Sequence, residues 1–313
     1  MTTNKTSNVR IAFMGTPEFA VASLDALVQE GFNVVGVITA PDKPAGRGLQ
    51  LQQSAVKKYA AEKGLPVLQP IKLRDPAFLE ALRTWQADVQ VVVAFRMLPE
   101  VVWAMPPLGT INVHGSLLPQ YRGAAPINWV LINGERETGV TTFKLQQEID
   151  TGNILLQEKM PIGETETAGE LHDRMKILGA QVLVKTIYDL ASGTLKEVPQ
   201  PTPANALKHA PKIDTETCRI DWTKPVNDVY NLVRGLSPYP AAFTELEGKK
   251  MKLFLAGKEQ RTPAELPGTF VTDKKTFLKF ACSDGYILVR ELQLEGKKRM
   301  AIADFLRGYR FAE

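Results

Sequence analysis

The first 200 residues alternate between short apolar runs and segments whose apolar residues recur at a helical period. The apolar runs are rich in β-branched residues and bounded by Gly or Pro, which predicts strands over residues 10–14, 33–39, 89–94 and 109–114. The helical spacing predicts helices over residues 19–29, 54–63 and 76–85. Such alternation is typical of a mostly parallel sheet covered by helices on both faces, so we predict a Rossmann-like, doubly wound α/β domain.

Two further apolar runs, over residues 140–145 and 154–160, extend the predicted sheet, and a long helical pattern follows from about residue 167 to residue 190. Thr167 is followed three residues later by Glu170. This spacing is that of a capping box, in which each side chain bonds to the backbone N–H of the other residue. We therefore expect the long helix to begin at Thr167.

The pattern changes after Gly193. Residues 196–212 contain four prolines and predict a stiff, extended linker. Beyond it lie one amphipathic helix, over residues 226–236, and short strands over residues 243–246, 251–256, 269–272, 277–280 and 286–294. About 100 residues of this pattern are typical of a small antiparallel barrel. We predict an α/β domain over residues 1–195, the linker, and an OB-like β-barrel domain over residues 213–313.

Composition narrows the class of protein. A hydrophobic fraction of 44% and a charged fraction of 23% are typical of a soluble globular protein. No apolar run approaches the length of a membrane span, and the polar first residues lack the apolar core of a secretory signal. The two cysteines, Cys218 and Cys282, form no metal-binding or redox motif. These features predict a cytoplasmic protein with no membrane partner, and we expect a monomer because nothing in the sequence demands an oligomer.

The positive charge is concentrated in the last third of the chain. Residues 1–206 hold 19 Lys and Arg against 20 Asp and Glu, whereas residues 207–313 hold 19 against 14. This surplus is either an ordinary solvated surface or the electrostatic footprint of a phosphate backbone. On the second interpretation we predict nucleic-acid contacts from Lys212, Lys250 and Lys252.

The loop over residues 40–50 contains two prolines, two glycines and two positive charges. It is either a flexible surface connection or a mobile arm that contacts nucleic acid, a role that surface loops often take. On the second interpretation Arg47 is the main contact and Lys43 assists it.

The candidate chemistry lies in three residues. Asn112 and His114 are two residues apart at the end of an apolar run, so in a strand their side chains would point to the same face. Asp150 precedes a Thr-Gly turn between two predicted strands, and a carboxylate beside an imidazole can fix its tautomer. No Ser or Cys nucleophile adjoins the histidine. The set therefore predicts acyl transfer to a nucleophile that the substrate supplies.

Each of these residues also has a purely structural interpretation, because histidines at strand ends often form hydrogen bonds with their neighbours and Asn and Asp are common turn residues.

The sequence contains no evident cofactor motif. Gly15-Thr-Pro is no dinucleotide fingerprint, so we expect neither a nicotinamide nor a flavin cofactor. His172 and His209 share no ligand spacing, and we predict no metal site.

Three motifs of this chain resemble the 10-formyltetrahydrofolate-dependent formyltransferases: Asn112-Val-His114-Gly-Ser-Leu-Leu-Pro119, Arg122-Gly-Ala-Ala-Pro126 and Asp150-Thr-Gly152. Residues 13–20 and 41–48 are similar to the members of this family that act on tRNA, and the similarity covers most of the chain. The resemblance implies transfer of a formyl group from the co-substrate 10-formyltetrahydrofolate to the α-amino group of methionyl initiator tRNA, for translation initiation.

The resemblance also implies roles for individual residues. Asn112 would hold the formyl oxygen, His114 would be a proton shuttle or oxyanion stabiliser, and Asp150 would orient His114 and a bound water. Folate would contact two segments, which consist of Phe95, Arg96, Met97 and Leu98 and of Ser116, Leu117, Leu118 and Pro119. The family's usual Ala-Tyr-Gly reads Ala94-Phe95-Arg96 here. We predict that Arg96 points away from the pterin or pairs with an acidic group.

Two other functions fit parts of the sequence. An enzyme with the same chemistry could formylate a nucleotide-linked amino sugar or glycinamide ribonucleotide, but it would not need the 41–48 loop together with a basic terminal barrel. A non-catalytic RNA-binding protein on this scaffold would have a broken catalytic trio, whereas Asn112, His114 and Asp150 are all present.

Overall fold

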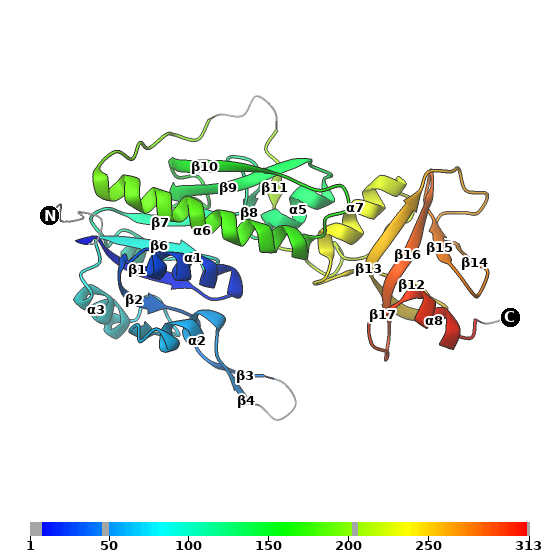
Figure 1. Cartoon of the computed structure of the whole chain (residues 1–313), viewed down its shortest axis with the longest axis horizontal. Coiled ribbons are helices and arrows are strands. Elements are labelled where there is room, and N and C mark those ends of the chain that lie inside the picture. Colours follow the sequence, from blue (N-terminus) through cyan, green and yellow to red (C-terminus); the bar gives the residue numbers. More distant parts are fainter. Residues whose placement is uncertain (1–7, 46–49, 202–205, 312–313) are drawn as a thin grey trace. The chain divides into compact units, whose positions relative to one another are not determined.

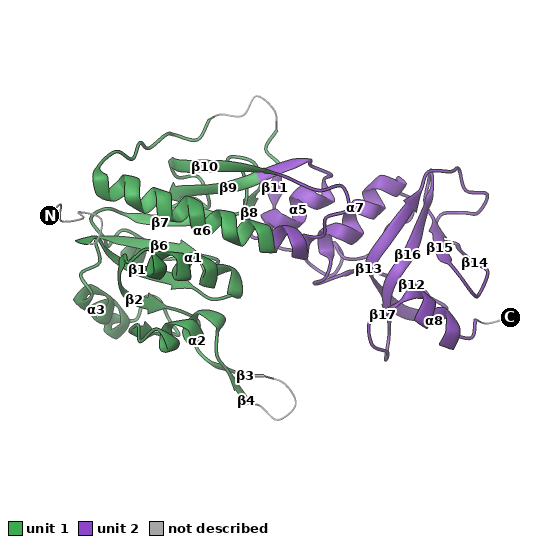
Figure 2. Ribbon diagram, in the orientation of Figure 1, with its two compact units in different colours: residues 1–122, 139–160, 173–208 green, residues 123–138, 161–172, 209–313 purple. Residues whose placement is uncertain are grey.

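The computed structural model describes residues 8–45, 50–201 and 206–311, and the chain divides into two compact units. Unit 1 comprises residues 1–122, 139–160 and 173–208, and unit 2 comprises residues 123–138, 161–172 and 209–313 (Figure 2). The chain therefore passes from one unit to the other more than once.

A seven-stranded sheet with the order β10-β9-β7-β6-β1-β2-β5 forms the centre of unit 1 (Figure 1). Its strands are β1 (Arg10–Gly15), β2 (Asn33–Ile38), β5 (Val67–Leu68), β6 (Val89–Val93), β7 (Thr110–His114), β9 (Glu137–Lys144) and β10 (Ile154–Pro161). The strands from β7 to β5 pair in parallel, whereas β9 runs antiparallel to β7. The predicted mostly parallel sheet is confirmed.

Helices cover both faces of this sheet. On one face, α3 (Pro76–Thr84) and α4 (Glu100–Trp103) share a core cluster with Ala12, Met14 and Val92 of the sheet. On the other face lies α6 (Ala168–Ser192), where a Cβ built at Gly179 would be 3.3 Å from the side chain of Val113. Unit 1 also contains the helices α1 (Glu18–Gln29) and α2 (Ala55–Glu62) (Figure 1). This two-sided cover is the doubly wound architecture that the alternating pattern predicts.

The long helix begins as the capping box predicts. The backbone N–H of Thr167 donates to the Glu170 carboxylate at 2.9 Å, and the N–H of Glu170 donates to the Thr167 hydroxyl at 3.4 Å. The hydrogen bonds from Thr167 hold the pKa of Glu170 below its ordinary value. The reciprocal bonds satisfy two N–H groups that have no partner within the helix.

Unit 2 contains a six-stranded sheet with the order β12-β13-β16-β15-β14, in which β17 pairs with β16. Its strands are β12 (Ala242–Leu246), β13 (Lys249–Glu259), β14 (Phe270–Thr272), β15 (Leu278–Ala281), β16 (Tyr286–Leu294) and β17 (Met300–Ala301). The strand pairings of this sheet are antiparallel, and the curled half-barrel confirms the predicted OB-like class. The core of this sheet contains the buried face of α7 (Val226–Leu236) together with Cys218 and Cys282. It also contains the stacked rings of Trp222 and Phe280, whose centroids are 4.7 Å apart.

Several short elements were not predicted. Residues 40–50 were expected as a loop, but β3 (Lys43–Ala45) lies within them and pairs antiparallel with β4 (Gln50–Gln52) in a hairpin. The helices α5 (Pro126–Ile132) and α8 (Ile302–Gly308) and the two-residue strands β8 (Arg122–Gly123) and β11 (His209–Ala210) complete the described elements. Elements of this length carry too few residues to establish a period.

Candidate active site

The candidate site lies at the carboxyl ends of the parallel strands of unit 1. The sheet continues from β1 to β2 on one side and to β6 on the other, so the strand order reverses between β1 and β6. In open α/β sheets, ligands bind outside the carboxyl ends of the strands at such a switch point. Val93 at the end of β6 is in register with Val113 of β7. The segment after β6 and the end of β7 therefore lie at the same edge of the sheet.

Asn112 and His114 project from one face of β7. Asn112 is in register with Val92, so both residues face α3 and α4, and His114 follows two residues later on the same face. His114 is 7% exposed and lies edge-on to the Phe143 ring, with 6.3 Å between the ring centroids. Among the residues that the structure describes, the half-buried Asn112 amide has no side-chain hydrogen bond. Its N–H groups are therefore available to an oxygen atom of a ligand.

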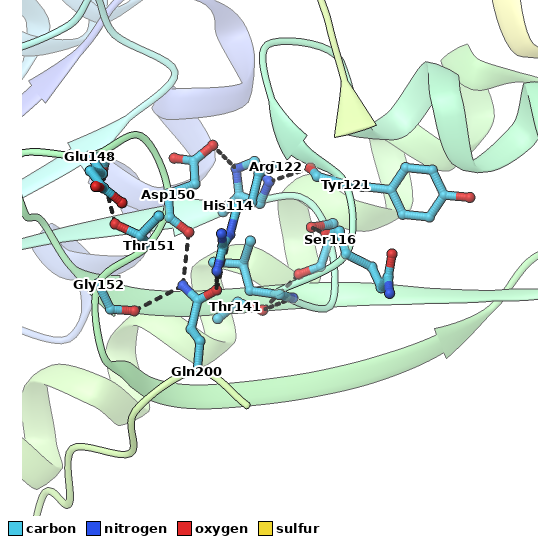
Figure 3. A network of polar contacts seen from close by, with 12 residues as sticks. His114, Ser116, Tyr121, Arg122, Thr141, Glu148, Asp150, Thr151, Gly152 and Gln200 are labelled. Atoms are coloured by element: carbon cyan, nitrogen blue, oxygen red, sulfur yellow. Dashed lines mark hydrogen bonds and ion pairs between the residues drawn. The ribbon is translucent and has the colours of Figure 1, made fainter. Parts of the chain in front are cut away.

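His114 is held between a carbonyl group and a carboxylate (Figure 3). Its Nε2 lies 2.9 Å from the main-chain oxygen of Tyr121, and its Nδ1 lies 3.8 Å from Oδ2 of Asp150. A carbonyl oxygen can only accept, so in the neutral ring Nε2 carries the proton and Nδ1 carries the lone pair. A proton gained at Nδ1 would face the Asp150 carboxylate. This geometry suits an imidazole that takes up a proton during a reaction.

Asp150 lies in a tight loop whose conformation depends on close contacts. Its φ of 54° is in the left-handed region, which few residues other than Gly, Asn and Asp adopt. The Thr151 hydroxyl donates to the carbonyl of Glu148 at 3.1 Å. A Cβ at Gly152 would lie 1.6 Å from the carbonyl oxygen of Lys144, so only glycine fits there. The Asp-Thr-Gly sequence therefore has a local structural reason as well as a chemical one.

The turn over residues 116–119 is fixed by a buried hydrogen-bond network. The Thr141 hydroxyl donates to the Ser116 carbonyl at 2.7 Å and accepts from the Leu118 N–H at 3.1 Å. The Ser116 hydroxyl donates to the carbonyl of Gln120 at 2.7 Å. Ser116, Leu118 and Pro119 are buried, which leaves the half-buried Leu117 as the most accessible residue of the turn. The sequence did not reveal the part played by Thr141.

The segment after β6 is held by Arg96. Its Nη1 donates to the Ile71 carbonyl at 2.9 Å, and its Nη2 donates to the Pro70 carbonyl. Of the two outcomes predicted for Arg96, pairing with an acidic group is not found among the described residues, and its guanidinium donates to these two carbonyls instead. Leu98 packs in the core, whereas the side chains of Met97 and Ile71 are 72% and 80% exposed. Apolar surface is thus available on both sides of the Arg96 contact.

The candidate tRNA-binding lysines keep their positive charge unneutralised. Within the described ranges, Lys43, Lys212, Lys250 and Lys252 have no carboxylate within ion-pair distance. Lys250 lies over the Phe243 ring, 3.8 Å from its centroid, and Lys252 donates to the Pro240 carbonyl at 3.2 Å. Both are on β13, where Met251 and Leu253, which alternate with them, are buried. Arg47 lies outside the described residues.

Two findings concern membranes and metals. Across the described parts of the chain, no helix is long and apolar enough to cross a membrane. In the same residues, no three His, Cys, Asp or Glu side chains are grouped so that they could hold a metal ion.

An amide, an imidazole and a carboxylate at the carboxyl edge of the parallel strands of a Rossmann-like sheet define a class of group-transfer enzyme that needs no nucleophile of its own. Residues 9–187 match the Formyl transferase family, and residues 212–310 match the Formyl transferase, C-terminal domain family. The chain belongs to the formyl transferase family.

Relatives of known function extend over the whole chain. It is 54% identical over 316 residues to the methionyl-tRNA formyltransferase of Bacteroides thetaiotaomicron, covering 99% of this chain and 98% of that protein. It is 56% identical over 316 residues to the methionyl-tRNA formyltransferase of Parabacteroides distasonis, covering 98% and 97%. These proteins match both units.

Solved structures share the fold at low identity. HypX from Aquifex aeolicus in complex with tetrahydrofolic acid has a TM-score of 0.66 at 18% identity, covering 98% of this chain and 49% of that chain. WlaRD, a sugar 3N-formyl transferase, has a TM-score of 0.68 at 19% identity, covering 93% and 99%. At these identities the likeness concerns the fold alone.

Proposed function

We propose that this chain transfers a formyl group from 10-formyltetrahydrofolate to the α-amino group of methionyl initiator tRNA. The observation that carries the proposal is the placement of His114, whose Nδ1 faces Asp150 and whose neighbour on the same strand face is the available Asn112 amide. The chain is more than 50% identical to methionyl-tRNA formyltransferases over nearly its whole length, which supports methionyl-tRNA as the acceptor.

The chemistry requires a proton acceptor and an oxyanion donor. The amine nitrogen forms a bond to the formyl carbon and loses a proton, the C–N10 bond breaks, and the folate nitrogen gains a proton. We assign the proton uptake and return to His114 Nδ1, with the Asp150 carboxylate stabilising the charged ring. We assign the donation to the formyl oxygen to the Asn112 amide. A free α-amino group has a pKa of roughly 7.7–8.0, and esterification of the adjacent carboxyl lowers this pKa, so much of the nucleophile is neutral near pH 7.

Substrate contacts follow from the same assignment. Folate would lie against the segment Phe95 to Leu98 and the turn Ser116 to Pro119, and the exposed Met97 supports an apolar contact there. The tRNA would contact Lys43, Arg47, Lys212, Lys250 and Lys252, of which the four described lysines have no neutralising carboxylate. The monomeric state and the cytoplasmic location stay predictions of the sequence.

The test is transfer of a labelled formyl group to methionyl initiator tRNA. We expect labelled formyl-methionine in the product and little transfer to methionyl elongator tRNA, which serves as the matched acceptor. Equal transfer to both tRNAs would remove initiator specificity from the proposal. Transfer to a nucleotide-linked amino sugar, with none to either tRNA, would replace the proposed acceptor.

A further inference from the structure

Gln200 lies in the segment predicted as a plain linker, yet its side chain is joined to the loop that carries Asp150 (Figure 3). We propose that Gln200 is a positioning residue for Asp150, and that residues 197–200, named here the strap, hold the 148–153 loop in its working geometry. The inference rests on the proposed function, since that function assigns Asp150 to the reaction.

The Gln200 amide contacts three residues through four hydrogen bonds, and these bonds fix its orientation. Its Nε2 donates to the carbonyl of Asp150 at 2.8 Å and to the carbonyl of Gly152 at 2.9 Å. Its Oε1 accepts from Arg122, with Nη2 at 2.5 Å and Nε at 3.2 Å. Both amide hydrogens and the amide oxygen are therefore used, and only one of the two flipped amide orientations satisfies all partners.

The strap is itself anchored by Val198 and Glu197, the residues that precede Gln200. Val198 exchanges two backbone hydrogen bonds with Ile154, at 2.8 and 2.9 Å. The Glu197 carboxylate pairs with Lys144 and accepts from the Asn153 amide at 3.2 Å, and the contact with Lys144 holds the pKa of Glu197 below its ordinary value. Lys144 ends β9 before the 148–153 loop, and Asn153 is the last residue of the loop. The strap thus contacts the strand that leads into the loop, the centre of the loop and its end.

These contacts act on the catalytic geometry because Gln200 donates directly to the backbone carbonyl of Asp150. The Asp150 carboxylate lies 3.8 Å from His114 Nδ1, and its backbone has a left-handed conformation. Loss of the Gln200 donors would leave two half-buried carbonyls without these bonds and allow the loop to relax. A displacement of about 1 Å at a catalytic group can lower a rate by roughly 100-fold.

Two substitutions separate positioning from simple attachment of the strap. Gln200→Ala removes all three contacts. Gln200→Glu keeps an oxygen for the Arg122 guanidinium, but its carboxylate cannot donate to the carbonyls of Asp150 and Gly152. We expect both variants to lower kcat by about 10- to 100-fold, with KM for tRNA and folate changed by less than about twofold. Gln29→Ala, at an exposed glutamine of α1, is the matched control and should keep the wild-type rate.

The route through Asp150 is tested by a double-mutant cycle. If Gln200 acts through the Asp150 carboxylate, adding Gln200→Ala to Asp150→Asn should lower kcat by less than about threefold further. A full 10- to 100-fold further loss would assign Gln200 a general structural role, and a wild-type kcat in Gln200→Glu would show that attachment to Arg122 is sufficient. Either result overturns the proposal.

A second measurement does not depend on catalysis. The chain has only three histidines, so ¹⁵N-histidine spectra contain three rings. At one fixed pH, the His114 ring signals should move in Gln200→Ala and Gln200→Glu toward their positions in Asp150→Asn, while those of His172 and His209 stay in place. Unmoved His114 signals would overturn the positioning role. A wild-type chain that transfers no formyl group would instead overturn the proposed function.

Discussion

At the level of single residues, the two partners of His114 leave one ring nitrogen for chemistry. Nε2 is committed to the Tyr121 carbonyl, so the proton exchange that we assign to this ring takes place at Nδ1. Replacement of His114 by alanine removes the proton acceptor, and we expect kcat to fall by about 100-fold or more. Steady-state formylation of methionyl initiator tRNA measures this directly. A rate near that of the wild type would exclude His114 from the reaction.

Asn112 tests the other half of the site. We expect Asn112→Ala to lower kcat by about 100- to 1,000-fold, the usual cost of removing one oxyanion donor. Asn112→Asp is the sharper variant, because it keeps the size of the side chain and places an acceptor where a donor is needed. Binding of tetrahydrofolate, followed by calorimetry, should stay close to wild type in the alanine variant. Loss of folate binding with an unchanged kcat would give Asn112 a binding role instead.

Arg96 shows where residue-level reasoning from the sequence fell short. The missing family glycine signals a changed loop, but a guanidinium can satisfy itself with backbone carbonyls as well as with a carboxylate. The partners at Pro70 and Ile71 lie 26 and 25 residues away, on another loop, and no local pattern identifies them. The same holds for Gln200 and Thr141, whose roles depend on contacts between distant segments.

We expect Arg96→Ala to raise KM for 10-formyltetrahydrofolate several-fold with little change in kcat, because the loop after β6 would lose its connection to residues 70–71. Arg83→Ala, at an exposed arginine of α3, changes charge equally and is the control. The measurement is the folate dependence of the formylation rate. An unchanged KM would separate the Arg96 contact from folate binding.

At the level of elements, the strongest periodic signals were the most reliable. The predicted helix over residues 226–236 and strand over residues 286–294 have the observed bounds of α7 and β16. Each has clear turn residues at its ends. The β3–β4 hairpin was missed because its strands are three residues long and one contains Pro44. Extended backbone in the strap was predicted from the prolines of residues 196–212, whereas the pairing of Val198 with Ile154 was not predicted.

The capping box of α6 gives a prediction with a definite pH dependence. The folded-state pKa of Glu170 is lowered, so its contribution to stability is present above its ordinary value of 4.5 and is lost as the pH falls through the lower folded value. We expect Glu170→Gln to destabilise the chain near pH 7 and to have a much smaller effect near pH 3. Thr167→Ala should cost about 1 kcal/mol, typical of a lost cap. Urea unfolding at the two pH values measures both effects, with Glu158→Gln, at an exposed glutamate of β10, as the control. An equal loss at both pH values would assign Glu170 a role other than that of a charged cap.

At the level of the whole molecule, charge as well as fold distinguishes the two parts of the chain. The surplus over residues 207–313 gains meaning from the structure, since several cations there are already paired. Arg299 is bound to Glu291 and Lys279 to Glu259, whereas Lys212, Lys250 and Lys252 have no such partner among the described residues. The net charge of a region therefore overstates its capacity for phosphate, and the unpaired lysines are the better guide.

Binding of tRNA should depend on salt through these lysines. Each lysine that contacts a phosphate releases a counterion on binding, so its removal should lower the slope of log K against log salt concentration by about 1. We expect Lys250→Ala to weaken binding of initiator and elongator tRNA alike and to reduce the slope by this amount, because a phosphate contact carries no sequence information. Lys185→Ala, at an exposed lysine of α6, removes the same charge from unit 1 and should leave the slope unchanged. Equal slopes for wild type and Lys250→Ala would place the tRNA backbone away from β13, whereas equal reductions in both variants would reflect net charge alone.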